Sequence, residues 1–184
     1  MFPPVALTRD PLQILKVDAI GYGAKDTGEM GGGAAAAVLA AAGPEILTEL
    51  RSRLATSSRR VGDVALTRAF KLEAVGIRRI VHIVSIIKHT PEGACCPQPM
   101  LLREGVCTAL LVASKAGARS VAISALGTGE GRVPPSDAAR YMFDGVRAFR
   151  QSAGASDLAV TFSLPSFRDY EAFSSVVQSH EPYA

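Results

Sequence analysis

The sequence predicts a layered α/β fold. Short apolar, β-branched runs alternate with longer segments of helical periodicity, and this pattern is typical of a sheet covered by helices. The chain has 184 residues, 48% of them hydrophobic. That length fits one full core and leaves little room for a second, so we expect a single α/β domain over residues 1–184.

Five segments have the composition of strands. Residues 17–20 are short and apolar, which predicts a buried strand ending at Gly21-Tyr22-Gly23. Residues 61–70 alternate apolar and polar side chains, as expected for a strand with one covered face. Residues 79–87 are more continuously apolar, which favours the interior of the sheet. The other two predicted strands are residues 120–126 and 158–164.

Five segments have helical patterns. Gly31-Gly32-Gly33 opens an Ala-rich helix that runs to Gly43, and Pro44 suits the first turn of the next helix. That next helix, residues 45–57, carries Ile46, Leu50 and Leu54 on one face. The remaining predicted helices are residues 100–116, 135–149 and 167–177, and a proline-rich loop is expected at residues 90–99.

Composition argues against several classes of function. The net charge of +3 comes from scattered Lys and Arg residues, so nucleic acid is not the expected main ligand. No apolar run approaches the roughly 20 residues of a membrane helix, so no membrane association is expected. Residues 1–10 lack the basic and apolar regions of a secretory signal, which makes the cytoplasm the expected location.

The cysteines predict neither a metal site nor a disulfide framework. Cys95 and Cys96 are adjacent and Cys107 stands apart, which fits no zinc-ligand spacing and no even-numbered pairing. We therefore predict reduced thiols, no metal and no cofactor.

Two glycine-rich segments follow predicted strands. Glycine lets the backbone approach a phosphate closely, and the free N–H groups of a helix N-terminus attract anions. Glycine also makes tight turns, which is the alternative for either segment alone. Two such segments at strand ends favour a diphosphate ligand. The dinucleotide fingerprint fails because Asp26 stands where its third glycine belongs, and no Gly-Lys-Ser or Gly-Lys-Thr of a P-loop occurs.

Four segments, taken in order, resemble the macrodomain family over most of the chain. They are Val17-Asp18-Ala19-Ile20, the glycine run with its helix and Ala42-Gly43-Pro44-Glu45, Val81-His82-Ile83-Val84, and Ser124-Ala125-Leu126-Gly127-Thr128-Gly129 with Pro134. The resemblance implies a three-layer α/β/α sandwich with a mixed central sheet. It also implies a cleft at the strand ends that holds ADP-ribose.

The resemblance also implies ligand-binding residues. The two phosphate loops would contain Gly32, Gly33 and Ala34, and Gly127, Thr128, Gly129 and Glu130. Asp10 resembles the acid that accepts a hydrogen bond from adenine, although its spacing to Val17 is one residue longer than is usual in the family; the alternative is a solvated turn aspartate. Phe167 is the candidate aromatic that packs on adenine, and its alternative is a core phenylalanine.

The chain departs from the family where hydrolases carry working side chains. Tyr22 and Lys25 stand at the positions of two asparagines, Ala35 replaces a catalytic aspartate, and Gly131 replaces an aromatic. The polar residues left in the altered segment are Lys25, Asp26, Thr27 and Glu29, and of these Lys25, Asp26 and Glu29 are the candidate catalytic residues. Alternatively, Lys25 neutralises phosphate, Asp26 begins a turn and Glu29 faces solvent, and we favour this interpretation.

The histidines add no catalytic arrangement to this set. His82 lies in an apolar run, where a buried, hydrogen-bonded histidine is the expected state. His89 follows that strand and is better placed for ligand contact.

Three functions remain open. The first is a module that binds free or protein-linked ADP-ribose. The second is a hydrolase that removes ADP-ribosyl or acyl groups from ADP-ribose derivatives. The third is a protein-binding or nucleic-acid-binding module that keeps the fold.

Overall fold

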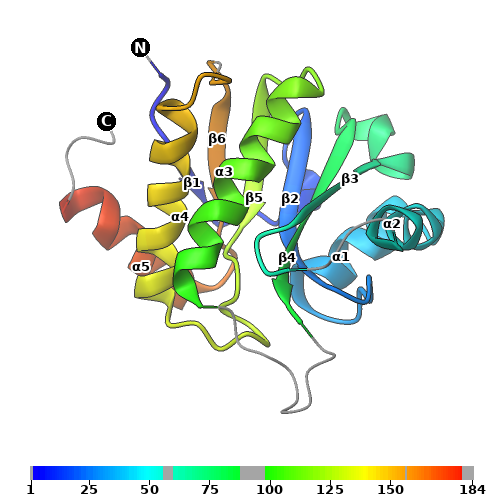
Figure 1. The fold of residues 1–184 in the computed structure, drawn as a ribbon, viewed down its shortest axis with the longest axis horizontal. Helices are drawn as coiled ribbons and strands as arrows, with labels where there is room; N and C mark the ends of the chain where they lie inside the picture. Colours follow the sequence, from blue (N-terminus) through cyan, green and yellow to red (C-terminus); the bar gives the residue numbers. More distant parts are fainter. Residues whose placement is uncertain (1, 56–59, 88–97, 156, 180–184) are drawn as a thin grey trace.

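One six-stranded sheet forms the centre of the protein. A computed structural model describes residues 2–55, 60–87, 98–155 and 157–179. The strand order is β1-β6-β5-β2-β4-β3, and all neighbours are parallel except β3 and β4 (Figure 1). The sheet is therefore mixed, as predicted. The strands are β1 (Ala6–Thr8), β2 (Ala19–Lys25), β3 (Val64–Arg68), β4 (Arg79–Ile86), β5 (Ser120–Ser124) and β6 (Ala159–Ser163).

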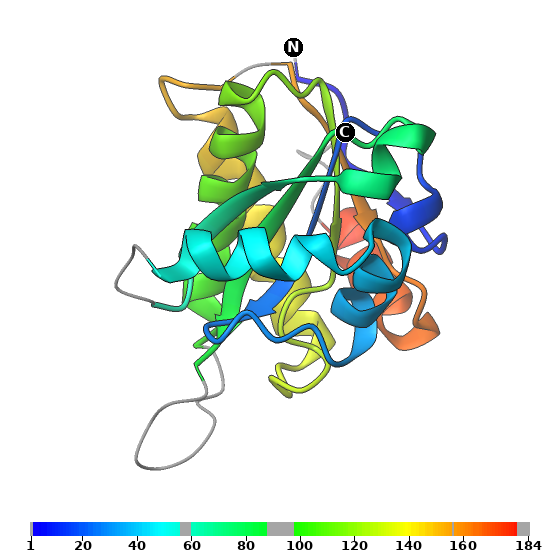
Figure 2. The same ribbon diagram turned by 90° about the vertical axis from the view of Figure 1, so that its right-hand side faces the viewer.

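Helices cover both faces of this sheet, which confirms the three-layer α/β/α prediction. Helices α1 and α2 lie on one face and α3, α4 and α5 on the other (Figures 1 and 2). Across the described ranges, no helix combines the length and apolarity needed to cross a membrane. The helices are α1 (Gly33–Ala42), α2 (Glu45–Ala55), α3 (Pro99–Lys115), α4 (Pro135–Arg150) and α5 (Phe167–Ser179), with 3-10 turns η1 (Leu12–Ile14) and η2 (Phe70–Val75).

The period-2 alternation of the strands separates two apolar clusters. On β4, Val81 and Ile83 pack toward α3 and α4, whereas Ile80 and Val84 pack toward α1 and α2. Almost every residue of β4 is buried, which agrees with its predicted place inside the sheet.

The first predicted strand does not end at Gly21-Tyr22-Gly23, because β2 continues to Lys25. These residues pair with β4 throughout, and Gly21 also pairs with β5. A Cβ on Gly21 would lie 3.3 Å from Cγ1 of Ile123, so glycine here reflects close strand packing rather than a turn.

Other boundaries also differ from prediction. The strand predicted at residues 61–70 is shorter at both ends. A turn comes before Val64, and η2 begins at Phe70, which has φ 53°. The predicted strand at 120–126 ends at Ser124. Strand β1 was not predicted: it has three residues and pairs only along one edge, with β6, so its sequence carries too short a pattern.

Asp18 joins three strands at the end of the sheet where β2 begins. Its carboxylate accepts hydrogen bonds from the backbone N–H groups of Arg119 (2.8 Å) and Ser120 (3.1 Å), from the Ser120 hydroxyl (3.1 Å) and from the Arg78 guanidinium (2.6 Å). These donors, the backbone N–H of Arg119 first, hold the pKa of Asp18 below its ordinary value of 3.8. The arrangement fixes the starts of β2, β4 and β5 relative to one another.

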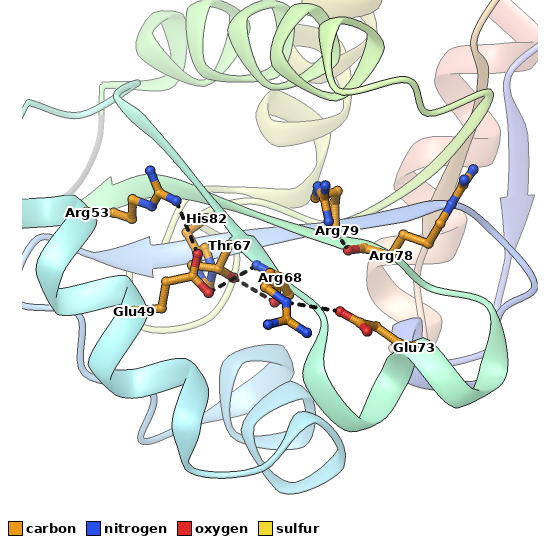
Figure 3. Close-up of polar contacts among 8 residues, drawn as sticks. All are labelled: Glu49, Arg53, Thr67, Arg68, Glu73, Arg78, Arg79 and His82. Carbon is orange, nitrogen blue, oxygen red and sulfur yellow. Dashed lines mark hydrogen bonds and ion pairs between the residues drawn. The ribbon is translucent and has the colours of Figure 1, made fainter.

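A buried polar chain crosses the middle of the sheet. The Tyr22 hydroxyl lies 2.6 Å from Nδ1 of His82. Nε2 of His82 lies 2.8 Å from the Thr67 hydroxyl, which donates to the Arg68 carbonyl (Figure 3). This order of donors makes Nε2 the protonated nitrogen of a neutral ring. Burial lowers the pKa of His82 to about 3. His82 is therefore the satisfied core histidine that was expected.

Helix α2 protects the exposed edge of the sheet next to this chain. The Glu49 carboxylate accepts a hydrogen bond from the backbone N–H of Arg68 on β3 and another from Arg53 one helical turn later (Figure 3). Because this N–H group is already bonded, the edge strand has fewer free backbone groups that could pair with a strand of another molecule.

Candidate functional site

A cleft opens at the carboxyl ends of β2, β4 and β5, between the two glycine-rich loops. It has two connected parts that share Gly33, Ala34, Ser124, Ala125 and Gly129. The part that we call the polar lobe measures about 260 Å³, and the part that we call the apolar lobe about 400 Å³. Ligands of open α/β sheets bind at this edge of the sheet.

The two lobes differ in chemistry. The polar lobe is lined by the side chains of Lys25, Glu29, Ser85 and Glu130 as well as by glycine backbone. The apolar lobe lies between η1 and the start of α5, where the lining residues include Pro11, Leu12, Ala37 and Pro165. The cleft can therefore accept a molecule with one polar end and one flat, apolar end.

The first loop presents backbone rather than side chains. Gly32 caps helix α1 in an extended conformation, and Gly33 begins the helix with φ 52°. A Cβ placed on Gly31, Gly32 or Gly33 would meet nothing within 4 Å. The N–H groups of the first helical turn have no acceptor inside a helix, so they are available to an anion in the cleft.

The second loop is a compact turn after β5. Gly127 has φ 76°, and its carbonyl accepts a hydrogen bond from the Val133 N–H at 3.0 Å. Inside that turn, the Arg132 N–H bonds the Gly129 carbonyl at 3.0 Å, and Arg132 itself has φ 52°. A bulky residue held at positive φ marks stored backbone strain, which is concentrated at functional sites.

An ion pair joins the end of β2 to the second loop. Nζ of Lys25 lies 2.8 Å from Oε2 of Glu130 and 3.9 Å from Oε2 of Glu29. The Lys25 side chain is 17% exposed, and both carboxylates are about half exposed. The positive charge of Lys25 is thus already balanced by protein groups within the polar lobe.

A bulge in β4 brings Ser85 into the same lobe. Ala24 of β2 pairs with Val84 and Lys25 pairs with Ile86, so Ser85 is left without an opposite residue. A Cβ on Gly23 would lie 2.6 Å from Oγ of Ser85, so the hydroxyl occupies space that a larger residue at position 23 would need. Bulges of this kind re-aim a side chain next to a site.

A hydrogen bond connects the second loop to the last helix on the apolar side. The Thr128 hydroxyl donates to Oδ2 of Asp169 at 3.3 Å, and Asp169 lines the apolar lobe. Burial raises the pKa of Asp169 above its ordinary value, against the lowering effects of Thr128 and Arg168.

The structure brings most of the predicted ligand-binding residues together. Gly32, Gly33 and Ala34 line the cleft from the first loop. Gly127, Thr128, Gly129 and Glu130 line it from the second. Both glycine runs therefore face one space, although they lie far apart in sequence.

Asp10 and Phe167 lie beside the cleft rather than in its lining. Asp10 is exposed in a turn in which the Thr8 hydroxyl donates to its carboxylate, which matches the turn-aspartate alternative. Phe167 is 60% exposed, with the Arg9 guanidinium 5.8 Å from its ring centre. The core-phenylalanine alternative is therefore wrong, because α5 begins at Phe167 and turns this ring outward.

The candidate catalytic residues are separated by the fold. Lys25 and Glu29 line the polar lobe, but Asp26 is 4% exposed and is absent from the lining. Its N–H bonds the Ile86 carbonyl, and the Gly28 N–H closes a turn onto the Lys25 carbonyl. The predicted turn at Asp26-Thr27-Gly28 is confirmed, and it holds Asp26 away from the cleft. Tyr22 also faces away, toward His82.

Several lining residues were not predicted as ligand contacts, among them the polar residues Ser85, Ser124 and Asp169. Ser124 begins the fourth segment that resembles the family, and the polar Ser85 inside an apolar strand is the signal that could have identified it. His89, Cys95 and Cys96 lie outside the described residues. Among the residues that are described, no group of three or more His, Cys, Asp or Glu side chains could hold a metal ion.

Comparison with known proteins gives relatives for the whole chain. It is 32% identical over 182 residues to an uncharacterised protein of Pyrobaculum aerophilum, covering 97% of this chain and 93% of the relative. It is 30% identical over 170 residues to an uncharacterised protein of Mycobacterium tuberculosis, covering 92% of this chain. The match spans only 44% of the mycobacterial protein, so that relative is more than twice as long as the region that it shares.

Solved structures with the same fold include nucleotide complexes. The Oceanobacillus iheyensis macrodomain with ADP superposes with a TM-score of 0.79 at 25% identity, over 94% of this chain and 89% of the other. The Trypanosoma brucei macrodomain in complex with ADP-ribose superposes with a TM-score of 0.75 at 26% identity, over 94% of this chain and 68% of the other.

A family profile completes the comparison. The Macro domain profile matches residues 23–142, more than half of the chain, and this range contains both glycine-rich loops. The chain therefore belongs to the Macro domain family.

Proposed function

We propose that the protein binds ADP-ribose or an ADP-ribose derivative, free or linked to a protein, and that it is primarily a binding module. The diphosphate lies between the two glycine-rich loops, adenine occupies the apolar lobe, and the distal ribose occupies the polar lobe. Relatives solved with ADP and with ADP-ribose support this class of ligand.

The proposal rests on glycines in both loops that neither the packing nor the backbone conformation of the protein requires. Elsewhere glycine is required by packing, as at Gly145, where a Cβ would lie 2.7 Å from the Arg103 carbonyl oxygen, or by positive φ, as at Gly76 and Gly117. At Gly31, Gly32 and Gly129 neither contacts nor positive φ requires it, since a Cβ would meet nothing within 4 Å. A ligand that touches the backbone at these positions supplies the missing reason.

Adenine in the apolar lobe follows from the chemistry of its lining. Proline, leucine and alanine side chains offer flat apolar contact, and Asp10 and Phe167 lie beside the opening. In this proposal Asp10 and Phe167 act from the rim, on the exposed edge of the adenine.

Slow or absent hydrolysis is part of the proposal. Tyr22 and Ala35 offer no group that could activate water in the cleft, and Lys25 is already paired with Glu130. Removing one preorganised group commonly costs about 10² to 10³ in rate. In single-turnover assays on glutamate- or aspartate-linked ADP-ribose, we therefore expect little release. Fast release that collapses in Lys25→Ala would instead establish a rearranged hydrolase.

Isothermal titration with ADP-ribose tests binding itself. We expect a one-to-one complex with a dissociation constant in the micromolar range, about −8 kcal/mol. The absence of both heat and thermal shift at millimolar ligand would overturn the proposal and favour a surface that binds protein or nucleic acid.

A further inference from the structure

Two serine hydroxyls at the floor of the cleft have no hydrogen-bond partner among the described residues. Ser85 is 2% exposed and Ser124 is 8% exposed. Every fully buried side-chain nitrogen or oxygen in the described part of the chain has a partner, so these two hydroxyls keep their access to the cleft. An unpaired hydroxyl in so closed a position is costly unless a ligand or water bonds it.

Ser163 provides the contrast. It ends β6 as Ser124 ends β5, it is 1% exposed, and it also lines the cleft. Its hydroxyl donates to the Asp10 carbonyl at 2.7 Å. A serine at this edge of the sheet can therefore form a hydrogen bond within the protein, and the hydroxyls of Ser85 and Ser124 form none with the described residues.

The fold also makes room for the Ser85 hydroxyl. The bulge in β4 leaves Ser85 unpaired across from β2, and Gly23 leaves space that this hydroxyl fills, 2.6 Å from where a Cβ would be. The bulge in β4, the glycine at position 23 and the unbonded Ser85 hydroxyl are three separate features at one point. All three are explained if the Ser85 hydroxyl must face the cleft.

We propose that Ser85 and Ser124 are ligand-binding residues with separate targets: Ser124 bonds the diphosphate and Ser85 bonds the hydroxyl groups of the distal ribose. This assignment rests on the proposed binding of ADP-ribose. Ser124 lines both lobes, at their junction, whereas Ser85 lines only the polar lobe with Lys25, Glu29 and Glu130.

The charges of the polar lobe agree with a neutral, hydroxyl-bearing group. Glu29 and Glu130 carry two negative charges against the single positive charge of Lys25. Carboxylates accept hydrogen bonds from sugar hydroxyls, and the Ser85 hydroxyl can donate or accept. A further phosphate at this end would face two carboxylates, so the lobe selects a free ribose.

The test measures the affinity of ADP-ribose and of ADP for Ser85→Ala and Ser124→Ala. ADP lacks the distal ribose. Because one neutral hydrogen bond contributes about 0.5–1.5 kcal/mol, Ser85→Ala should weaken ADP-ribose binding about 3- to 10-fold and leave ADP binding unchanged. Ser124→Ala should weaken both ligands by the same factor. Ser175→Ala, whose hydroxyl bonds Glu171 within α5, is the matched control.

Gly23→Ala tests the same idea without removing a hydroxyl. Its new Cβ must displace Oγ of Ser85, so the loss should again be specific to ADP-ribose, and adding Gly23→Ala to Ser85→Ala should cost little more. Melting temperature verifies that each variant is folded.

The outcomes separate the two proposals. If the parent binds neither ligand, the proposed function fails. If the parent binds both and Ser85→Ala weakens neither, or weakens both equally, the assignment of Ser85 fails while the proposed function stands.

Discussion

The two ends of the central sheet differ in how far their polar side chains are hydrogen-bonded within the protein. Where β2 begins, the Asp18 carboxylate accepts bonds from two backbone N–H groups, a hydroxyl and a guanidinium. Where β4 and β5 end, the hydroxyls of Ser85 and Ser124 have no partner in the described chain. The saturated end stabilises the fold and the unsaturated end is available to a ligand, so stability and binding should respond to different substitutions.

The largest expected effect is on binding at the open end. Gly32→Val and Gly129→Val each place a side chain where a Cβ has no neighbour within 4 Å, so the fold should persist while the ligand is blocked. We expect ADP-ribose affinity to fall by at least about 100-fold, roughly 2.7 kcal/mol. Calorimetry measures affinity, circular dichroism checks folding, and Ala40→Val, on the exposed face of α1, is the control.

Gly33→Val is a less clean test of the same loop. Gly33 has φ 52°, so a valine there also strains the backbone whatever the ligand does. Wild-type affinity in both Gly32→Val and Gly129→Val would mean that the loops are only turns.

The next effect is on stability at the saturated end. Asp18→Ala leaves the N–H groups of Arg119 and Ser120 without their acceptor, which should cost about 1–3 kcal/mol in the free energy of unfolding. ADP-ribose affinity should not change. Urea denaturation measures the loss, and Asp144→Ala, which removes an exposed ion pair with Arg147, should cost less than about 1 kcal/mol.

The lowered pKa of Asp18 predicts how the stability lost in Asp18→Ala depends on pH. Because the folded-state pKa lies below the unfolded value, the stabilisation is present above the unfolded pKa and is lost as pH falls through the folded one. The difference in stability between parent and Asp18→Ala should therefore shrink in strong acid. A difference that stays constant to low pH would contradict the assigned role.

A third effect concerns the buried hydrogen-bonded side chains of Tyr22, His82 and Thr67, which lie between the two ends of the sheet. His82 has its pKa lowered from 6.5 to about 3, so between these values the unfolded chain binds a proton that the folded chain does not. Its stabilisation is complete above about pH 6.5 and is lost on acidification, by about 1.4 kcal/mol per pH unit at most. Urea midpoints at about pH 7.5 and 5.5 in parent and His82→Gln measure it. Equal pH dependence in both proteins would exclude His82 as the source.

The smallest expected effect is at Lys25. A lysine free to bond a diphosphate would cost about 10-fold or more in affinity when removed, since charged hydrogen bonds contribute about 1.5–3 kcal/mol. Lys25 is already bonded to Glu130, so Lys25→Met should change ADP-ribose affinity by less than about 3-fold. Lys71→Met, an exposed lysine of η2, is the control. A loss of tenfold would show that Lys25 leaves Glu130 for the ligand.

Patterns between near neighbours in sequence determined much of this protein. Period-2 and period-3.6 patterns identified five strands and five helices and placed β4 inside the sheet. The glycine runs at residues 31–33 and 127–131 predicted where the cleft would open. These features are legible because glycine and apolar periodicity act through the local backbone and one face of an element.

The tertiary structure alone decided how the remaining polar side chains are used. The bonds of Asp18 to Ser120 span 102 residues, and the bond of Tyr22 to His82 spans 60. The same is true of the pairing of Lys25 with Glu130 and of the bulge that turns Ser85 toward the cleft. Such contacts depend on strand register, which is set by the packing of the whole sheet and leaves no pattern among neighbouring residues.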